Sequence, residues 1–174
     1  MQTIGKLKVC ENITLRQISE LIKFSNTDPV ILSTTRDNER FKDKIAFNAW
    51  RAKRRKIYTL ADEHKKLFGI IWFGIKSLPK NIHYYTSLDT SRYTITLAIR
   101  FYEPARGKGL SNLFINKAWD LYKETKEYLD NPNKGIWLET NINNFPAISA
   151  YKNLGFKLVS KPDAVTGKVI MLQL

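Results

Sequence analysis

The stretch from residue 136 to residue 156, which reads IWLETNINNFPAISAYKNLGF, decides the fold of this 174-residue chain. Its first five residues are rich in β-formers and predict a strand over 136–140. Asn144 then starts a short predicted helix over 144–154, because asparagine is a preferred helix N-cap, and a glycine follows at 155. Alternation of strands and helices in this half of the chain implies at least one parallel strand pair.

A second junction between a strand and a helix lies upstream. Residues 93–102 (YTITLAIRFY) predict a long strand, and the turn RGKGLS at 106–111 precedes an amphipathic helix. The apolar face of that helix consists of Leu110, Leu113, Phe114, Ala118, Leu121 and Tyr122. Glycines let a backbone approach a ligand, and the N–H groups that open a helix favour a phosphate. Arg106 and Lys108 would add positive charge, although the glycines could serve turn geometry alone, and the turn matches neither the Walker loop nor the dinucleotide fingerprint.

The remaining chain supplies further strands and helices. Predicted strands cover 3–9, 56–61 and 67–75, a final strand pair flanks 162–167, and predicted helices cover 14–24 and 39–55. Thr14 and Gln17 form a predicted capping box for the first helix. The second helix should bury a face made of Phe41, Ile45, Ala49 and Ala52. The element order β-α-α-β-β-β-α-β-α-β-β predicts an α/β single domain with a mixed sheet over residues 1–174.

The composition limits the class of protein. The chain has 43% hydrophobic and 26% charged residues, which excludes collagen-like and globally disordered proteins. Cys10 is its one cysteine, so no internal disulfide can form, and the apolar run 67–75 is too short to span a membrane. His64 and His83 lack the ligand spacing of a metal site. We therefore expect a cytoplasmic protein without a metal and without a membrane partner.

The two junctions together resemble the GNAT superfamily of acetyl-CoA-dependent N-acetyltransferases. The resemblance is specific from about Tyr93 to Phe156, and over the first 90 residues it consists only of the order of elements. It implies a mixed, mostly antiparallel sheet with one splayed parallel strand pair and flanking helices. The spacing from Trp-Leu-Glu at 137–139 to Asn144 and Tyr151 is most similar to that of the ribosomal-protein N-terminal acetyltransferases.

The resemblance also implies how acetyl-CoA would bind as co-substrate. Its pantetheine arm would pair with the backbone near Ile99 and Phe101, in the gap between the splayed strands. The pyrophosphate loop would be Arg106, Gly107, Lys108, Gly109, Leu110 and Ser111. Ser111 departs mildly from the family, which usually has glycine or alanine there. Asn144 would hydrogen-bond the arm, and an ordinary N-cap is the alternative role for this residue.

Two residues match the catalytic positions of the family. Tyr151 would be the general acid, because a phenol with a pKa near 10 stays protonated and can give its proton to the departing thiolate. The alternative is an aromatic ring packed against Phe156 or Trp137. Glu139 would be the base for an amine that is mostly protonated at neutral pH, and the alternative is a carboxylate paired with a lysine. Glu103 is a weaker candidate base, and direct attack of the amine on the thioester is the implied chemistry.

The acceptor amine is of unknown class, and the net charge bears on it. Lys and Arg exceed Asp and Glu by 29 to 16, a formal charge of +13 that favours anionic partners. An acidic protein, the ribosome or a charged tRNA would suit this charge as the partner that carries the amine, whereas polyamines would be repelled unless the pocket is locally acidic. The sequence is also compatible with a homodimer. The alternative function is a non-catalytic CoA- or RNA-binding module that uses the basic helix end Arg51–Lys56, which could equally be a solvated face.

Overall fold

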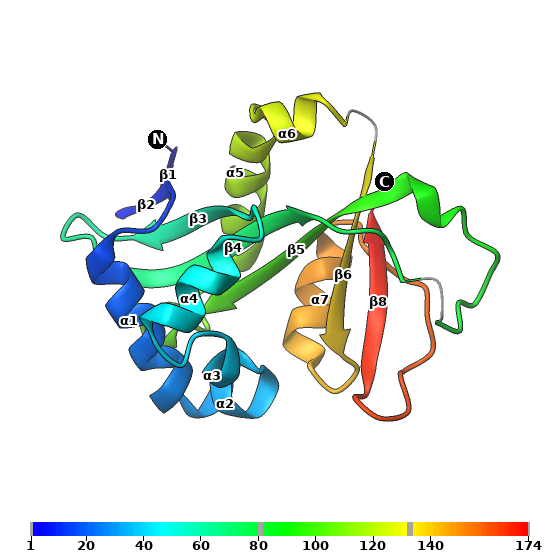
Figure 1. The fold of residues 1–174 in the computed structure, drawn as a ribbon, viewed down its shortest axis with the longest axis horizontal. Coiled ribbons are helices and arrows are strands. Elements are labelled where there is room, and N and C mark those ends of the chain that lie inside the picture. Colours follow the sequence, from blue (N-terminus) through cyan, green and yellow to red (C-terminus); the bar gives the residue numbers. More distant parts are fainter. Residues whose placement is uncertain (1, 80–81, 132–133, 174) are drawn as a thin grey trace. The chain divides into compact units, whose positions relative to one another are not determined.

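The computed structural model describes residues 2–79, 82–131 and 134–173. Its strands form one sheet in the order β1-β2-β3-β4-β5-β6-β8-β7 (Figure 1). The strands are β1 (Gln2–Ile4), β2 (Leu7–Glu11), β3 (Lys56–Ala61), β4 (Leu67–Ile75), β5 (Tyr93–Phe101), β6 (Gly135–Asn141), β7 (Lys157–Leu158) and β8 (Lys168–Gln173). The pair β5–β6 is parallel, whereas β1–β2, β2–β3, β6–β8 and β7–β8 are antiparallel. The predicted mixed, mostly antiparallel sheet with one parallel pair is therefore confirmed.

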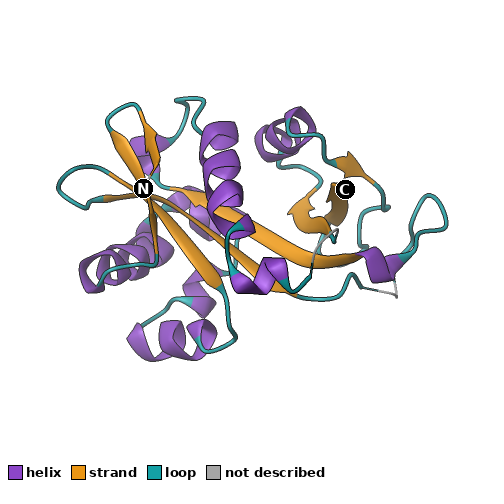
Figure 2. Cartoon of the chain, turned by 90° about the horizontal axis from the view of Figure 1, so that it is seen from above, coloured by secondary structure: helices purple, strands orange, loops and turns teal. Residues whose placement is uncertain are grey.

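Helices lie between these strands along the chain, and Figure 2 shows them in purple beside the orange strands. They are α1 (Leu15–Thr27), α2 (Pro29–Thr34), α3 (Asp37–Arg40), α4 (Lys44–Arg51), α5 (Ser111–Lys123), α6 (Lys126–Leu129) and α7 (Phe145–Asn153), with short 3-10 turns at Thr90–Arg92 and Glu103–Ala105. The chain divides into two compact units, the first made of Met1–Trp72 and Ile99–Trp119, the second of Phe73–Ala98 and Asp120–Leu174. The single domain over residues 1–174 stays a prediction.

In the first unit, helix α1 begins where the sequence places it. The backbone N–H of Gln17 donates to Thr14 Oγ1 at 3.3 Å, and the N–H of Thr14 donates to Gln17 Oε1 at 3.0 Å. This capping box satisfies N–H groups that the first turn of a helix leaves unpaired. Asp28 ends α1 and also caps α2, because its side chain accepts from the N–H groups of Val30 and Ile31.

The predicted helix over 39–55 is wrong, because the chain forms two separate helices there. The side chain of Asp43 accepts a hydrogen bond from Ala46 N at 2.8 Å and so starts α4 after a break. This start rotates the face that meets the core, so that Phe47 and Trp50 are buried while Ile45 is 82% exposed. The predicted strand over 3–9 is likewise two strands, β1 and β2, joined by a turn in which Gly5 has a φ of +58°.

The core of the second unit includes the contact between β5 and β6. Leu78, Tyr93, Trp137, Ile170 and Leu172 form a buried cluster. Tyr93 pairs with Gly135 across the parallel strands, and a bulge follows between Tyr93 and Ile95. Glycine is needed at 135 because the aromatic ring of Tyr93 occupies the space that a side chain would take.

We expect the substitution Gly135→Ala to destabilise the protein by about 1 to 3 kcal/mol. A Cβ at this position would lie 2.6 Å from Tyr93 Cδ1 and 3.0 Å from the carbonyl oxygen of Gln173. Urea unfolding at pH 7 measures the loss. In a Tyr93→Leu background the same substitution should be less destabilising, and an unchanged urea midpoint in the wild-type background would contradict the prediction.

Candidate functional site

The parallel pair β5–β6 is short relative to its strands. The register joins Tyr93 to Gly135, Ile95 to Ile136 and Thr96 to Trp137. Beyond these pairs β5 continues to residue 101 and β6 to residue 141. Among the residues described, the register between the two strands thus ends well before either strand does.

The backbone of β5 presents a defined set of groups on the edge away from β4. The carbonyl of Thr94 accepts from Lys76 N at 2.8 Å, and Tyr102 N donates to the carbonyl of Phe68 at 3.1 Å. At the bulge, the carbonyls of both Tyr93 and Thr94 accept from the segment after β4, so the direction at the end of β5 is set by Tyr102. Tyr102 and, two residues before it, Arg100 direct their polar backbone groups toward β4. Because these directions alternate along a strand, Ile99 and Phe101 direct theirs to the opposite edge. This is the edge that the resemblance assigns to the pantetheine arm.

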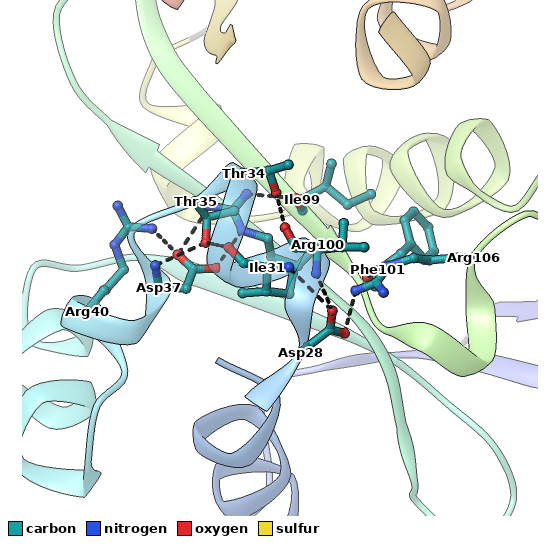
Figure 3. Close-up of polar contacts among 11 residues, drawn as sticks. Asp28, Ile31, Thr34, Thr35, Asp37, Arg40, Ile99, Arg100, Phe101 and Arg106 are labelled. Carbon is teal, nitrogen blue, oxygen red and sulfur yellow. Dashed lines mark hydrogen bonds and ion pairs between the residues drawn. The ribbon is translucent and has the colours of Figure 1, made fainter. Parts of the chain in front are cut away.

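Arginine side chains bind the two carbonyls of that edge. Arg106 Nε donates to the carbonyl of Phe101 at 2.9 Å, and Arg100 Nη1 donates to the carbonyl of Ile99 at 2.8 Å (Figure 3). The Nη2 group of Arg106 also forms an ion pair with Asp28. The guanidinium of Arg106 is therefore held by groups of the protein, which the motif alone did not indicate.

The ion pair between Asp28 and Arg106 stabilises the charged form of the carboxyl. Burial alone would raise the pKa of Asp28, but the hydrogen bonds from Arg106 and from the N–H groups of Ile31 and Val30 outweigh burial and hold the pKa below its ordinary value. Asp28 is consequently a carboxylate at neutral pH. Through these contacts Asp28 links the start of α2 to Arg106, which precedes the glycine turn.

The glycine turn after β5 has the backbone conformation that its sequence predicts. Gly107 has a φ of +71° and Gly109 a φ of +65°, a region that other residues rarely adopt. The segment from Gly107 to Gly109 is exposed, and α5 begins at Ser111 with the bond from Phe114 N to the carbonyl of Leu110 at 2.9 Å. An exposed turn that opens a 13-residue helix is suited to bind an anion. The helix does not bury all of its predicted apolar face, since Leu113 is exposed.

In the second unit, Asn144 caps α7. Its side chain accepts a hydrogen bond from Ala147 N at 3.3 Å. The N-cap alternative is therefore confirmed for this residue. Its contact with a pantetheine arm stays a prediction, and one side chain can serve both roles because the amide NH₂ group is not used by the cap.

Tyr151 lies on α7 and is 7% exposed. Its ring is 5.8 Å from the ring of Phe156 with an interplanar angle of 58°, and Phe156 N donates to the carbonyl of Tyr151 at 3.0 Å. The packing alternative against Phe156 is thus observed. The general-acid role stays a prediction, which this packing is compatible with because it holds the ring in one orientation.

Glu139 lies on β6 opposite Ile170 of β8. Its side chain is 32% exposed, and its Oε2 lies 3.5 Å from Lys168 Nζ. The lysine-paired alternative is therefore observed, in a partly solvated pair that contributes little to stability. Burial raises the pKa of Tyr84, and the nearby charge of Glu139 raises it further. Glu139 is therefore a partly exposed residue of β6, and its role as the base stays a prediction.

A buried carboxylate that sequence reasoning missed lies in the first unit. Asp37 is 1% exposed, and its Oδ1 accepts from Arg40 Nη1 at 2.6 Å. Arg100 binds the same carboxylate through Nε at 2.6 Å and Nη2 at 3.2 Å (Figure 3). Because Asp37 and Arg100 are 63 positions apart, no local sequence pattern indicates their ion pair.

The basic segment predicted at the end of the second helix is largely exposed. Arg51, Lys53, Arg54 and Lys56 are exposed around the end of α4, whereas Arg55 is half-buried. The described residues contain no group of three or more His, Cys, Asp or Glu that could hold a metal ion. No helix in the described part of the chain is both long and apolar enough to cross a membrane.

Comparison with known proteins identifies the fold through solved structures alone. No family model matches the chain, and no curated protein matches its sequence. The crystal structure of spermidine N-acetyltransferase from Vibrio cholerae in complex with CoA and spermine is similar with a TM-score of 0.67 at 16% identity, covering 97% of this chain and 94% of that one. A candidate acetyltransferase from Acinetobacter baylyi is similar with a TM-score of 0.68 at 16% identity, covering 96% and 90%.

A further solved structure of the Vibrio cholerae spermidine enzyme, described as dodecameric, has a TM-score of 0.60 at 14% identity and covers 97% of this chain and 92% of that one. At these identities the comparisons establish the fold, which is the GNAT fold implied by the motifs.

Proposed function

We propose that this chain, which has the GNAT fold, transfers an acetyl group from acetyl-CoA to a primary amine. The observation that carries the proposal is the exposed glycine turn at 107–109, which follows β5 after the 3-10 turn at Glu103–Ala105. The pairing of β5 with β6 stops at Thr96. A strand edge that does not pair with β6, followed by a turn with two left-handed glycines, offers backbone donors and acceptors to a long amide-bearing carrier that ends in phosphates, once the two arginines release its carbonyls. The similar Vibrio cholerae structure contains CoA, which supports the same assignment.

Acetyl-CoA would supply an acyl group activated as a thioester. The residues from Arg106 to Ser111 would bind its pyrophosphate through backbone N–H groups, with Lys108 adding an exposed positive charge. The backbone of Ile99 and Phe101 would pair with its pantetheine arm, which requires Arg100 Nη1 to release the carbonyl of Ile99 and Arg106 Nε to release that of Phe101. Asn144 would bind the same arm through its amide NH₂ group.

The protein residues would manage protons in a direct attack. The acceptor amine forms the new C–N bond, the C–S bond breaks, and the sulfur leaves as the thiol of CoA. The Tyr151 hydroxyl would give its proton to the sulfur, and Glu139 would accept the proton that the amine loses, directly or through water. Positioning of the two substrates supplies the rest of the rate enhancement.

The proposal includes several classes of acceptor amine. The motif spacing resembles that of ribosomal-protein N-terminal acetyltransferases, while the structures similar in fold include a spermidine enzyme. A protein amine, a ribosomal component and the aminoacyl group of a charged tRNA all fit a protein of charge +13. A screen of acceptors tests the proposal: acetyl-CoA is supplied with fractionated protein, RNA and metabolites, and acetylated products are identified by mass spectrometry. Absence of CoA release with every fraction would contradict it.

We expect Glu139→Gln to lower kcat/KM by about 10- to 100-fold at pH 7 and by less at pH 9. An amine with a pKa of about 10.4 is mostly protonated at pH 7, so a base is needed, whereas more of it is already neutral at pH 9. Thiol release at a series of pH values measures the difference between the variant and the wild type. The control is Glu103→Gln, which removes the exposed alternative base. A wild-type pH profile in Glu139→Gln would exclude Glu139 as the base.

The alternative function is a module that binds RNA through the end of α4. It is favoured by the exposure of Arg51, Lys53, Arg54 and Lys56 in one short segment. RNA affinity that falls steeply with salt, together with no CoA release for any amine, would favour this alternative.

A further inference from the structure

Three arginine side chains of the first unit pack against the rings of two tryptophans, Trp50 and Trp72. We call Arg40, Arg55 and Arg100 the guanidinium cluster. Arg40 lies 5.8 Å and Arg100 5.1 Å from the ring centre of Trp72, and Arg55 lies 4.9 Å from that of Trp50. The two tryptophan rings contact each other edge to face, with centres 5.2 Å apart. Indole faces attract cations, so the two tryptophan rings hold these side chains in place.

The guanidinium cluster contains more positive than negative charge. Arg40 and Arg100 both form ion pairs with the carboxylate of Asp37. Arg55 donates to the carbonyl of Trp50 at 2.8 Å, and no carboxylate among the described residues forms an ion pair with it. Glu39 acts on Arg40 at longer range but is exposed and forms no ion pair with it.

The excess charge has an energetic consequence. Burial lowers the pKa of Arg40, and the charge of Arg100 lowers it further against the opposing effect of Asp37. Burial likewise lowers the pKa of Arg55, with a contribution from the charge of Arg40. Cations that are partly removed from water and close together are stabilised by an added anion. Guanidinium groups suit carboxylates and phosphates because their planar N–H donors match two oxygens at once.

The guanidinium cluster also lies next to the strand edge that the proposed function uses. Arg100 binds Asp37 through Nε and Nη2, and with Nη1 it binds the carbonyl of Ile99 on that edge. A ligand group held by the cluster would consequently be close to the backbone of Ile99. The side chain of Arg40 is 35% exposed, so the cluster has access to solvent.

We propose that the guanidinium cluster binds a carboxylate or phosphate group of the acyl acceptor, so that the acceptor is an amine that also carries an anionic group. The identification of this ligand as the acceptor rests on the proposed function, whereas anion binding by the cluster does not. The proposal separates this protein from the spermidine enzymes of similar fold, because a polycation would be repelled by the guanidinium cluster.

Inorganic phosphate is the probe for anion binding. The thermal midpoint is measured in phosphate and in chloride at equal ionic strength, for the wild type, Arg40→Gln and Arg36→Gln. Arg40→Gln leaves Asp37 paired with Arg100, and Arg36→Gln removes the same charge from an exposed side chain on the adjacent turn. With phosphate at about ten times its dissociation constant, we expect a rise of about 3 to 5 °C in the wild type and in Arg36→Gln. Arg40→Gln should lose at least half of this rise, and an equal rise in all three proteins would overturn the proposal.

Matched acceptors test the second half of the proposal. The pairs are β-alanine with β-alaninamide and phosphoethanolamine with ethanolamine, and spermidine is the polycation. We expect the anionic member of a pair to have a kcat/KM at least about 10-fold higher, since a bidentate charged contact is lost in its partner. The preference should approach parity in Arg40→Gln and persist in Arg36→Gln. A preference for the neutral amines or for spermidine overturns the acceptor assignment.

Failure of the proposed function is distinguishable from failure of the anion site. If no amine in either pair releases CoA while phosphate still stabilises the wild type and not Arg40→Gln, the anion site stands and the acceptor assignment falls. If CoA is released but phosphate and chloride act alike on every variant, the proposed function stands and the anion site falls.

Discussion

Replacement of Tyr151 by phenylalanine is expected to lower kcat by about 100-fold or more while the fold is retained. The substitution removes only the hydroxyl, so the ring keeps its contact with Phe156 at 5.8 Å between centres. Without the phenol, the sulfur of CoA must leave as a thiolate or take its proton from water. Because the loss concerns a proton transferred during the reaction, KM for acetyl-CoA should change much less than kcat. Thiol release with an accepted amine at saturating acetyl-CoA measures the effect.

The control for this substitution is Tyr85→Phe. Tyr85 is an exposed tyrosine of the same unit, and loss of its hydroxyl should leave kcat unchanged. Thermal midpoints of both variants show whether the fold is affected. A Tyr151→Phe enzyme with wild-type kcat would exclude Tyr151 as the general acid and would leave ring packing as its role.

The regular elements that carry the candidate site could be predicted from sequence. The strand predicted over 93–102 is observed over Tyr93–Phe101, and the one predicted over 136–140 lies within Gly135–Asn141. Both are runs of β-forming residues bounded by turn residues, which is a signal that depends on neighbours in sequence alone. The glycines at 107 and 109 belong to the same class of local signal, since their positive φ is a property of the turn itself.

The helices of the first unit could be predicted less well. The stretch over 39–55 has apolar residues at helical spacing, but Asp43 interrupts it by capping α4. The capping interaction competes with helix continuation, and the periodic pattern does not show which of the two is more favourable. As a result the periodic pattern assigns Ile45 to the core although it is exposed, and it does not single out Trp50, which is buried.

The partners of the site residues could not be predicted at all. The motif identifies Arg106, yet the ion pair of Arg106 with Asp28 joins residues 78 positions apart. The same holds for Asp37 and Arg100. An ion pair across such a separation depends on how helices and strands pack, so a single sequence contains the charges but not their pairing.

Removal of the Asp37 carboxylate is expected to be among the most destabilising single changes in the first unit. Asp37→Ala leaves Arg40 and Arg100 without the carboxylate that they share, and the loss of one partner from a buried ion pair costs about 3 to 5 kcal/mol. Because Arg40 is partly exposed, we expect a value near the lower end, about 3 kcal/mol. Urea unfolding at pH 7 measures it. The matched control is Asp130→Ala, which breaks the exposed pair with Lys126 at 2.9 Å and should cost less than about 1 kcal/mol.

A second substitution shows whether the loss in Asp37→Ala comes from charge. If uncompensated cations cause it, adding Arg40→Gln to Asp37→Ala should recover part of the lost stability, because it removes one of the two guanidiniums that had shared the Asp37 carboxylate. If the loss came instead from the empty volume left by the side chain, the double variant would be no more stable than Asp37→Ala. The effect of phosphate on stability also distinguishes uncompensated charge from empty volume. An anion that replaces the missing carboxylate should stabilise Asp37→Ala more than the wild type, since the charge excess of the guanidinium cluster rises by one.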